Sequence, residues 1–585
     1  MHNSSALLFV AQICVACAER AAQPPAAAAP VTADASVVAD AAAVADAVAA
    51  VDATAVADTA VVSDTATGAD AAAASDGSAD NWRSALFPAD WSPALTDSQG
   101  HFLHDFSYAG YHNSAVALPQ WPGAKVFEAA GFGADPTATT DMTAPIQAAL
   151  DAAGKAGGGV VHLAKGLYRV DGTLKVTKSG VVLRGDGPDM TRLYFSKSAG
   201  MAYQAHLTLG SVPKDGLELP LAATATNRSA VLHIADAAKL QVGQTVAIGW
   251  VITPQFVADH GMTGIWKAFN GKWQPFFRRK IVAIDATKNL PTVTLDVPLR
   301  SDALLRDQAS VRVQTGYVSE VGVEHLGLSN AVGWDEAWLP TQAHVLALQG
   351  VADAWVDDVA TFASPLGPQA GQGVGAHVLS GGLIVEASMR VTIANTHIGR
   401  AENRGDGGNG YLFELRTSSE VLMRDCSGSD GRHNFIQNWG FGTSGWVLLR
   451  CASTGGTNQL VKDDPFGIVA KSEFHHSLAM GNLIDSCTFG DGFQGVNRGN
   501  ESTGAGHTAT QTVMWRPSGK GEVKSLQFGW GYVIGSAPET IVTTALTDFY
   551  GGGTAPEDYT EGLGKQANLL PVSLFEAQLA LRLGK

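Results

Sequence analysis

One polar stretch between Asp430 and Thr508 contains most of the side chains that are suited to acid–base chemistry. They are Arg432, His433, Asp463, Asp464, His475, His476, Arg498 and His507. An imidazole titrates near neutral pH and can accept or return a proton, whereas a guanidinium binds carboxylates through two parallel hydrogen bonds. The stretch therefore predicts proton transfer beside a bound anion, with Arg432, His433, Asp463, Asp464, His475, His476 and Arg498 as candidate catalytic residues.

The same stretch is rich in amides and carries an aromatic side chain that could contact a substrate. The candidate substrate-binding residues are Asn434, Trp439, Asn458, Gln494, Asn497 and His507. Segments this polar are predicted to be loops, which often carry binding and catalysis. Stacked amides can also be purely structural, so a non-catalytic role stays open for each residue taken singly.

Repeats of variable length surround the polar stretch and must position it. VGVEHLGLSN, AWVDDVATFAS, VTIANTHIGR, VLMRDCSGSD, WVLLRCASTGG and NLIDSCTFGDG align with one another, and the alignment predicts one equivalent inward position in each. That position is occupied by Leu326, Val359, Thr396, Cys426, Cys451 and Cys487, at spacings of 33, 37, 30, 25 and 36 residues. Such repeats are typical of a solenoid whose turns differ in loop length, with inward side chains about 4.8 Å apart.

The alignment also predicts where the polar side chains lie on the solenoid. Counting seven residues past each of the three cysteines reaches His433, Asn458 and Gln494, which we expect to form a polar row, one turn apart. The loops 459–476 and 497–515 should then project from neighbouring turns over that row. A groove along the coil would suit a linear polymer.

The repeats are preceded by a block with a helix signal and four strand signals. Asp141 is a plausible N-cap, Pro145 is tolerated in the first turn, and glycines 157–159 end the helix. Short strands are predicted over 160–163, 168–170, 174–176 and 181–183, each followed by a turn signal.

This block, FGADPTATTDMTAPIQAALDAAGKAGGGVVHLAKGLYRVDGTLKVTKSGVVLRGDG, resembles the N-terminal region of the pectate-lyase-like right-handed parallel β-helix superfamily. Pectate lyases, polygalacturonases, β-1,3-glucanases, epimerases and phage tailspikes share that fold. The resemblance implies an all-β, single-stranded right-handed parallel β-helix with an N-terminal capping helix. It says little about the reaction, because one fold hosts several chemistries.

We predict seven segments along the chain, and a small inserted β domain interrupts the coil because alternating strand patterns replace the repeats there. The segments are a signal peptide over 1–17, a tether over 18–80, an N-terminal arm over 81–130, the cap helix and first turns over 131–202, the inserted domain over 203–314, the main coil over 315–550, and a C-terminal loop and helix over 551–585. In the last segment Ser573 and Glu576 form a capping box.

The first two segments predict export. Residues 7–16 are an apolar run of signal-peptide length that ends near Cys17, which resembles the lipidated cysteine of a lipoprotein. An Asp then recurs every six residues from Asp34 to Asp76 among small residues, a pattern that leaves no apolar face to pack. We expect a secreted or cell-surface protein, with the membrane contacted only through a lipid at Cys17.

The distribution of charge along the chain limits the classes of partner that we expect. The formal charge is −16, but residues 18–80 carry Glu19, Arg20 and nine Asp, a net of −9, which leaves −7 for the remainder. A mildly acidic body gives no reason to expect a nucleic-acid partner or a charged membrane surface. A polysaccharide is the expected partner.

Three functions stay open at this point. Cleavage of an acidic, uronate-containing polysaccharide by β-elimination is favoured because His and Arg dominate the polar stretch; no cofactor is required, although Asp463 and Asp464 could hold Ca²⁺ in place of an arginine. An inverting glycoside hydrolase is the second, but Asn395-Thr396-His397 stands where polygalacturonases have Asn-Thr-Asp. The lyase motif is incomplete too, because the RxPxxR segment of the main pectate lyases is missing. A non-catalytic glycan-binding or tailspike-like module is the third.

Overall fold

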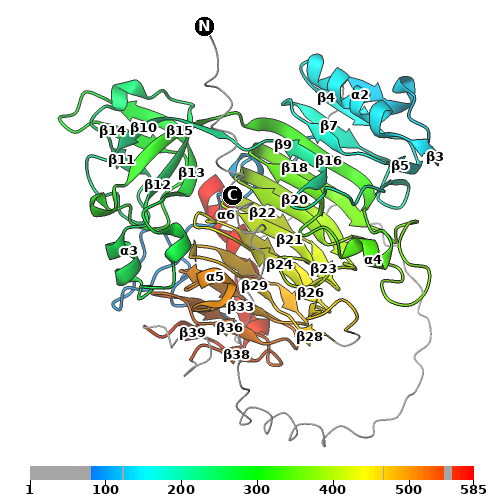
Figure 1. Cartoon of the computed structure of the whole chain (residues 1–585). Coiled ribbons are helices and arrows are strands. Elements are labelled where there is room, and N and C mark those ends of the chain that lie inside the picture. Colours follow the sequence, from blue (N-terminus) through cyan, green and yellow to red (C-terminus); the bar gives the residue numbers. More distant parts are fainter. Residues whose placement is uncertain (1–80, 121–123, 465–466, 546–555) are drawn as a thin grey trace, which may run out of the picture. The chain divides into compact units, whose positions relative to one another are not determined.

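Three columns of short parallel strands stack turn upon turn to form one continuous coil (Figure 1). The computed structural model describes residues 81–120, 124–464, 467–545 and 556–585, within a unit that runs from Ser78 to Lys585. The predicted signal peptide, the anchor at Cys17 and the tether lie outside the described residues. Strands this short suit a coil because every backbone group can pair with the turns above and below.

The strands of each column pair in parallel with their neighbours from the turns above and below. The first column consists of β2 (Val126–Glu128), β4 (Gly159–His162), β7 (Val181–Arg184), β22 (Ser419–Arg424), β25 (Val447–Leu449), β31 (Leu483–Asp485), β35 (Val513–Trp515), β37 (Tyr532–Ile534) and β39 (Tyr559–Glu561). The second consists of β3 (Thr137–Asp141), β5 (Gly166–Val170), β8 (Thr191–Phe195), β23 (Ser427–Ser429), β26 (Ala452–Thr454) and β32 (Thr488–Phe489). Three long strands bend through both columns: β16 (Val318–Ser329), β18 (Val351–Thr361) and β20 (Met389–Gly399).

The third column carries the polar stretch. It consists of β6 (Leu174–Val176), β9 (Ala205–Gly210), β17 (His344–Gln349), β19 (Gly381–Glu386), β21 (Tyr411–Arg416), β24 (His433–Gln437), β29 (Ser472–Phe474), β33 (Phe493–Gly495), β36 (Val523–Ser525) and β38 (Val542–Thr543). Its inward side chains, such as Phe413 and Phe435 with ring centroids 4.8 Å apart, stack in the core. Its outward side chains form one continuous face, which we name the third-column face.

The inward ladder that the repeats predicted is confirmed. Leu326 pairs with Val359 and Val359 with Thr396, while the neighbours of the three cysteines pair in the same register, Ser427 with Ala452 and Ala452 with Thr488. All six ladder side chains are at most 2% exposed. Cys426, Cys451 and Cys487 are free thiols that fill the interior as small apolar groups.

Six successive turns change direction between the first and second columns at a single residue with a positive φ angle. Left-handed backbone favours Gly, Asn and Asp, yet here it recurs in these six turns because the pairing above and below fixes it. These corners are His325, Asp358, Asn395, Asp425, Arg450 and Ser486, with φ between 46° and 56°.

The N-terminal end of the coil is covered by helix α2 (Thr143–Lys155), which buries Ile146, Ala149 and Leu150. The helix begins two residues after Asp141, so the prediction of Asp141 as its N-cap is wrong. Asp141 instead ends strand β3, and from there its carboxylate accepts a hydrogen bond from the Thr143 amide at 2.9 Å. The four predicted strands that follow are present as β4, β5, β6 and β7.

An antiparallel six-stranded sheet interrupts the coil between its third and fourth turns. It comprises β10 (Lys214–Pro220), β11 (Val231–His233), β12 (Thr245–Val251), β13 (Trp273–Asp285), β14 (Thr292–Leu295) and β15 (Ser310–Thr315). Helix α3 (Pro254–Asp259) lies in the connection between β12 and β13. We name residues 214–315 the inserted sheet. Its aromatic residues Trp266, Phe276 and Phe277 are fully buried in its own core, together with Phe441 from the coil.

Buried charges fasten the inserted sheet to the coil. Glu420 in β22 is 1% exposed and pairs with Arg279 at 3.1 Å and with Arg300 at 2.7 Å. Both arginines belong to the inserted unit and are themselves at most 2% exposed. One buried carboxylate therefore holds two buried guanidiniums at this junction.

The remaining elements line the flanks of the coil. An arm that includes β1 (Trp82–Arg83) packs Leu86, Phe87 and Phe106 on the first column beside helix α6 (Leu574–Leu583). Ser573 caps α6 by accepting from the Glu576 amide, which is one half of the predicted capping box, whereas the Glu576 carboxylate pairs with Arg450 at 2.8 Å. The others are α4 (Trp334–Ala337), α5 (Glu501–Gly504), β27 (Thr457–Asn458), β28 (Ile468–Val469), β30 (Ala479–Met480), β34 (Ala509–Thr510) and β40 (Leu569–Leu570). Among the described residues, no helix has the length and apolarity needed to cross a membrane.

Candidate functional site

Five side chains meet on the third-column face, and we name them the histidine–glutamate cluster. They are Tyr411 from β21, His433 from β24, Glu473 from β29, His475 directly after β29, and Arg498 after β33. The parallel pairing brings them together, because Tyr411 pairs with His433, Ile436 with Glu473, and Glu473 with Gln494. Three predicted catalytic residues, His433, His475 and Arg498, therefore lie in one place.

Glu473 is the centre of the cluster. Its Oε1 contacts His475 Nδ1 in a short hydrogen bond and lies 3.5 Å from His433 Nε2 and 3.9 Å from Arg498 Nη1. Gln494 donates to its other oxygen. The carboxylate is 1% exposed, so several donors must compensate its burial.

The hydrogen bonds define the tautomer of His433. The Lys471 carbonyl, 2.5 Å from His433 Nδ1, can only accept, so the neutral ring carries its hydrogen on Nδ1. His475 Nδ1 lies between the Glu473 carboxylate, which accepts, and Arg498 Nη1 at 2.8 Å, which donates, so these contacts suit a hydrogen on either of its ring nitrogens. The Nε2 of His475 faces the Ser502 hydroxyl at 3.2 Å and the Tyr411 hydroxyl at 3.4 Å.

Burial sets the charges in the cluster. Burial, assisted by the Arg498 charge and opposed by Glu473, lowers the pKa of His433 to about 4 and that of His475 to about 3, so both rings are neutral at neutral pH. Burial alone would raise the pKa of Glu473, but Arg498 and the two histidines hold it well below its ordinary value. Burial raises the pKa of Tyr411, so its hydroxyl keeps its proton.

The cluster offers three ligand atoms for a metal ion, from His433, Glu473 and His475, all within 4.8 Å of one another. The Arg498 guanidinium lies among them, 2.8 Å from His475 Nδ1, and also donates to the His475 carbonyl at 2.9 Å. A cation placed there repels a second one. The arrangement therefore favours an arginine-neutralised anion site over a metal site.

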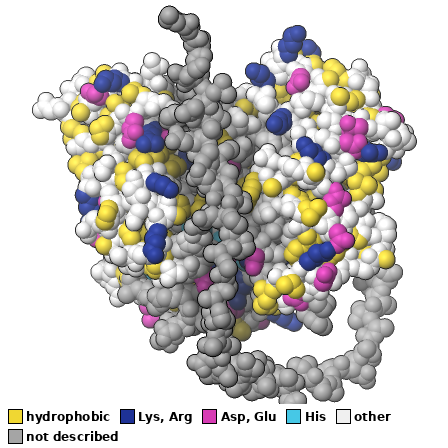
Figure 2. Space-filling model, viewed as in Figure 1, with side chains coloured by type: hydrophobic (Ala, Val, Ile, Leu, Met, Phe, Trp, Pro, Cys, Tyr) yellow, Lys and Arg dark blue, Asp and Glu magenta, His cyan; other side chains and the backbone are white. Residues whose placement is uncertain are grey.

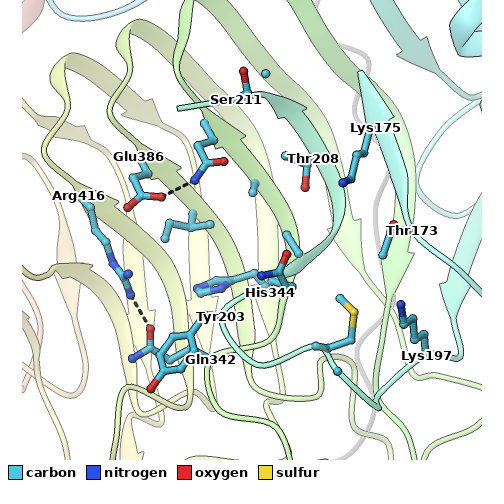
Figure 3. A pocket seen from close by; sticks show the side chains of 18 of the residues that line it. Thr173, Lys175, Lys197, Tyr203, Thr208, Ser211, Gln342, His344, Glu386 and Arg416 are labelled. Atoms are coloured by element: carbon cyan, nitrogen blue, oxygen red, sulfur yellow. Dashed lines mark hydrogen bonds between the residues drawn. The ribbon is translucent and has the colours of Figure 1, made fainter. Parts of the chain in front are cut away.

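A cavity of about 570 Å³ opens on the same face, toward the N-terminal end of the coil (Figure 3). Lys175, Thr173 and Lys197 stand on one side of it and Glu386 and Arg416 on the other, with His344 between them. Tyr203 and Gln342 lie below Arg416, which donates to Gln342 at 2.6 Å. The sequence did not single out these residues, because they come from strands far apart in the chain, on either side of the inserted sheet.

Polar contacts connect the cavity to the cluster. Glu414 in β21 binds His344 at 2.9 Å, Arg416 at 2.5 Å and the Asn438 amide at 2.8 Å. Burial would raise the pKa of Glu414, but Arg416 and His344 lower it to about 2, so it is ionised. Asn438 stands one turn from His475, whose amide donates to the Gln437 carbonyl at 2.8 Å. The cavity and the cluster thus belong to one continuous polar face.

An aromatic wall borders the cluster. Trp439 is 45% exposed, and its ring centroid lies 4.3 Å from that of His476 and 5.8 Å from that of Phe269 of the inserted sheet. His476 bonds the Ser477 hydroxyl and the Ser502 carbonyl through its two ring nitrogens. The structure therefore places Trp439 as an exposed stacking surface and His476 as its support.

Other predicted residues lie around or beneath the cluster. Arg432 stands 6.0 Å from the Tyr411 ring and donates to the Gly405 carbonyl at 2.8 Å, so it borders the site. Asn497 accepts from the Gly499 amide and shapes the loop that holds Arg498. His507 is 7% exposed and packs against Phe528, with ring centroids 5.1 Å apart.

The predicted row of His433, Asn458 and Gln494 is wrong. The position that pairs with Gln494 is Glu473, and Asn458 lies in the β27–β28 hairpin, paired with Ile468. The connection between β26 and β29 is longer than the matching connections in the turns just before and after it, β23 to β24 and β32 to β33. Counting seven residues past Cys451 therefore reaches the hairpin rather than the next strand.

Asn434 is also placed differently from the prediction. It is fully buried at a corner of the coil, where its amide donates to the Ser453 hydroxyl at 3.0 Å and to Asp491 at 2.9 Å. Its carbonyl accepts from the Gly431 amide. These bonds satisfy its polar atoms inside the protein, so it stabilises the corner and does not face a ligand.

The acidic pair lies in the hairpin loop. The Asp463 carboxylate accepts from Trp334 Nε1 at 3.5 Å, and the Asp464 carbonyl accepts from Gln459 at 3.3 Å. The structure thus groups Asp463 with the α4 loop rather than with the histidine–glutamate cluster. The expected calcium site at Asp463 and Asp464 stays a prediction.

Comparison with known proteins shows which family the first turns of the coil resemble. Residues 126–231 match the family model described as "Rhamnogalacturonase A/epimerase, pectate lyase-like". The chain is a right-handed parallel β-helix protein, and its first turns resemble that family over the matched residues. The matched residues of this β-helix protein run from β2 to β11, that is, through the capping helix, the first turns and the start of the inserted sheet. No curated protein matches the sequence at a significant level.

Solved structures with a similar fold are distant. ORF18 of Geobacillus virus E2 is 10% identical with a TM-score of 0.38, and the match covers 74% of this chain and 61% of that one. The tailspike gp49 from Pseudomonas phage LKA1 is 15% identical with a TM-score of 0.39, over 74% and 80%. A hyperthermoactive exopolygalacturonase from Thermotoga maritima is 11% identical with a TM-score of 0.30, over 72% and 74%. Similarities this low carry no information about the activity of this β-helix protein.

Proposed function

We propose that this β-helix protein cleaves an acidic, uronate-containing polysaccharide by β-elimination at the histidine–glutamate cluster. One observation carries the proposal: Glu473 and Arg498 hold His475 at Nδ1, so that its Nε2 faces the Tyr411 hydroxyl. The proposal takes the tautomer in which Nδ1 donates to Glu473 and Nε2 is the base. A neutral base, a proton donor and a fixed cation are the three groups that elimination next to a carboxylate requires.

The proposed reaction has four steps. Arg498, with Arg432 at the border, binds the uronate carboxylate and stabilises the charge that develops on it. His475 Nε2 removes the proton alpha to the carboxylate, and that electron pair forms a carbon–carbon double bond as the glycosidic carbon–oxygen bond breaks. Tyr411 gives its proton to the leaving oxygen. The His475 imidazolium then returns its proton to Tyr411 across the 3.4 Å contact.

The aromatic wall and the cavity supply binding. Trp439 presents an exposed ring on which a sugar can stack, and the polar face continues from the cluster into the cavity through Glu414 and Arg416. A linear polymer could therefore contact several turns at once. Polysaccharide is the proposed partner, and nucleic acid is not.

Hydrolysis is the second candidate. An inverting hydrolase needs one carboxyl that is protonated at working pH. The two buried carboxylates on the face, Glu414 and Glu473, are held ionised by their cationic partners. Asp491, whose burial raises its pKa, is bound to Asn434 and Ser453 inside the coil. These contacts favour elimination over hydrolysis.

Two further properties belong to the proposal. Arg498 supplies the positive charge at the cluster, so we propose that no metal is required, and calcium at Asp463 and Asp464 remains the alternative. We also propose that the protein is exported and held at the cell surface through Cys17, from the sequence pattern alone.

The test is incubation of the full-length protein with a panel of uronate-containing and neutral glycans, read by ultraviolet absorbance and by new reducing ends. Absorbance from an unsaturated product is expected with at least one uronate polymer. Reducing ends without absorbance would overturn elimination in favour of hydrolysis. Binding without either product would favour a non-catalytic glycan-binding or tailspike-like module.

A further inference from the structure

A second cavity lies at the N-terminal end of the coil, between helix α2 and strands β6 and β7. Its volume is about 300 Å³, and its charged lining consists of Lys155, Lys175, Lys178 and Asp151. Lys175 and Thr177 also line the larger cavity, so the two cavities adjoin. The polar face therefore continues past the larger cavity onto the capping helix.

The charges along this end are predominantly positive. Five cationic side chains line the two cavities, Lys155, Lys175, Lys178, Lys197 and Arg416, against two carboxylates, Asp151 and Glu386. The body of the protein as a whole is acidic, so this balance is local. Figure 2 shows Lys and Arg side chains over this end of the coil, at the upper right.

The charges of Lys155, Lys175, Lys178 and Lys197 are not neutralised by a neighbouring carboxylate in the described part of the chain. In the described part of the chain none of them forms an ion pair, and all four are exposed. Lys239, by contrast, is paired with Asp236 at 2.7 Å. Unpaired like charges at one edge repel each other, which a bound anion would relieve.

The backbone holds two of these lysines in place. Gln147 in α2 exchanges hydrogen bonds of 2.9 and 3.0 Å with the Lys175 backbone, which fixes β6 against the helix. The Lys178 stem lies across Gly154, where a Cβ atom would come within 2.8 Å of Lys178 Cγ. A glycine at 154 thus allows the lysine to lie against the helix.

We infer that the two cavities form one cationic path that binds the carboxylate-bearing sugar units of an acidic polymer between the cluster and helix α2. This inference rests on the proposed function and adds to it a preference for polymers long enough to reach α2. Because the lysines are exposed, their attraction depends on ionic strength.

The test uses the full-length protein with polygalacturonate and alginate as probes and neutral dextran as the reference. The double variant Lys155→Gln and Lys178→Gln should weaken binding of the tighter-bound polyuronate about tenfold at low salt, and should reduce the dependence of Kd on salt. The matched control, Lys280→Gln with Lys520→Gln, removes two exposed, unpaired lysines elsewhere and should bind as the wild type does.

Gly154→Ala provides an independent check, because it displaces Lys178 without removing its charge, and should weaken binding by a smaller factor than the double variant. Wild-type binding by the Lys155 and Lys178 double variant would overturn the inference, as would equal binding of dextran and polyuronates by the wild type. If the wild type yields no unsaturated product but the double variant still weakens binding, the proposed function fails and the cationic path stands.

Discussion

At the scale of single residues, the environment of each histidine decides its role. The sequence offers His433, His475, His476 and His507 as equals, but only His475 has its Nδ1 fixed by a carboxylate while its Nε2 faces two hydroxyls. Both ring nitrogens of His476 are hydrogen-bonded, one to the Ser477 hydroxyl and the other to the Ser502 carbonyl. A base must have a free nitrogen, so we expect His475, and not His476, to carry the proton transfer.

His475→Gln should lower kcat by about 10² to 10⁴, because it removes the base and keeps the side chain polar. The comparison variant His476→Gln should change kcat far less, since that ring supports Trp439. Steady-state kinetics on the glycan identified by the panel, with circular dichroism to verify folding, measure both. A folded His475→Gln variant that keeps wild-type kcat would place the base elsewhere.

Trp439→Ala should raise KM about threefold to tenfold with little change in kcat, because a stacking contact is worth about 0.5–1.5 kcal/mol and is made before and during the reaction. Leu581→Ala on helix α6, another exposed apolar side chain, is the control and should leave KM unchanged. If KM is unaltered in Trp439→Ala, the aromatic wall is not a sugar platform.

At the scale of elements, the repeated turns of the coil could be predicted from the sequence, whereas the positions of side chains in the loops that interrupt those turns could not. The ladder through Thr396, Cys426 and Cys451 was predictable because a one-residue slip would turn an apolar side chain outward. The hairpin that holds Asn458 breaks the count in one turn only. Tyr411 and His344 were missed because each occupies an ordinary strand position. In addition, the neighbours of His344 come from turns on either side of the inserted sheet.

The junction between the inserted sheet and the coil gives a prediction about stability. Glu420→Gln should lower the free energy of unfolding by about 3–5 kcal/mol, since it leaves the buried Arg279 and Arg300 without a compensating charge. Asp285→Asn breaks the exposed pair with Lys288 and should cost far less, because solvent screens that pair. Urea unfolding compares the two variants, and equal losses would mean that the buried triad does not stabilise the junction.

At the scale of the whole molecule, buried histidines make stability depend on pH. Burial lowers the pKa of His104 to about 3 and that of His206 to about 4, below the value of about 6.5 in an unfolded chain. Between those values the unfolded state binds more protons than the folded state, so stability is lost as the pH falls.

Buried acids whose pKa is raised act in the opposite direction. Burial raises the pKa of Asp485 to about 7 and that of Asp558 to about 6, so the stability they contribute is present in acid and is lost as the pH rises toward those values. The histidines with lowered pKa outnumber these acids, so the free energy of unfolding should fall between about pH 6.5 and pH 4. Urea titrations across that range measure it, and a rise toward acid would contradict the assignment.

The stacked thiols of Cys426, Cys451 and Cys487 have a consequence for measuring motion. Each is at most 2% exposed, so a thiol reagent can reach them only when their turns of the coil separate. Their labelling rates, read peptide by peptide with mass spectrometry, would report how often the turns beneath the histidine–glutamate cluster open. Slower labelling with a bound polyuronate would show that the polymer holds those turns closed.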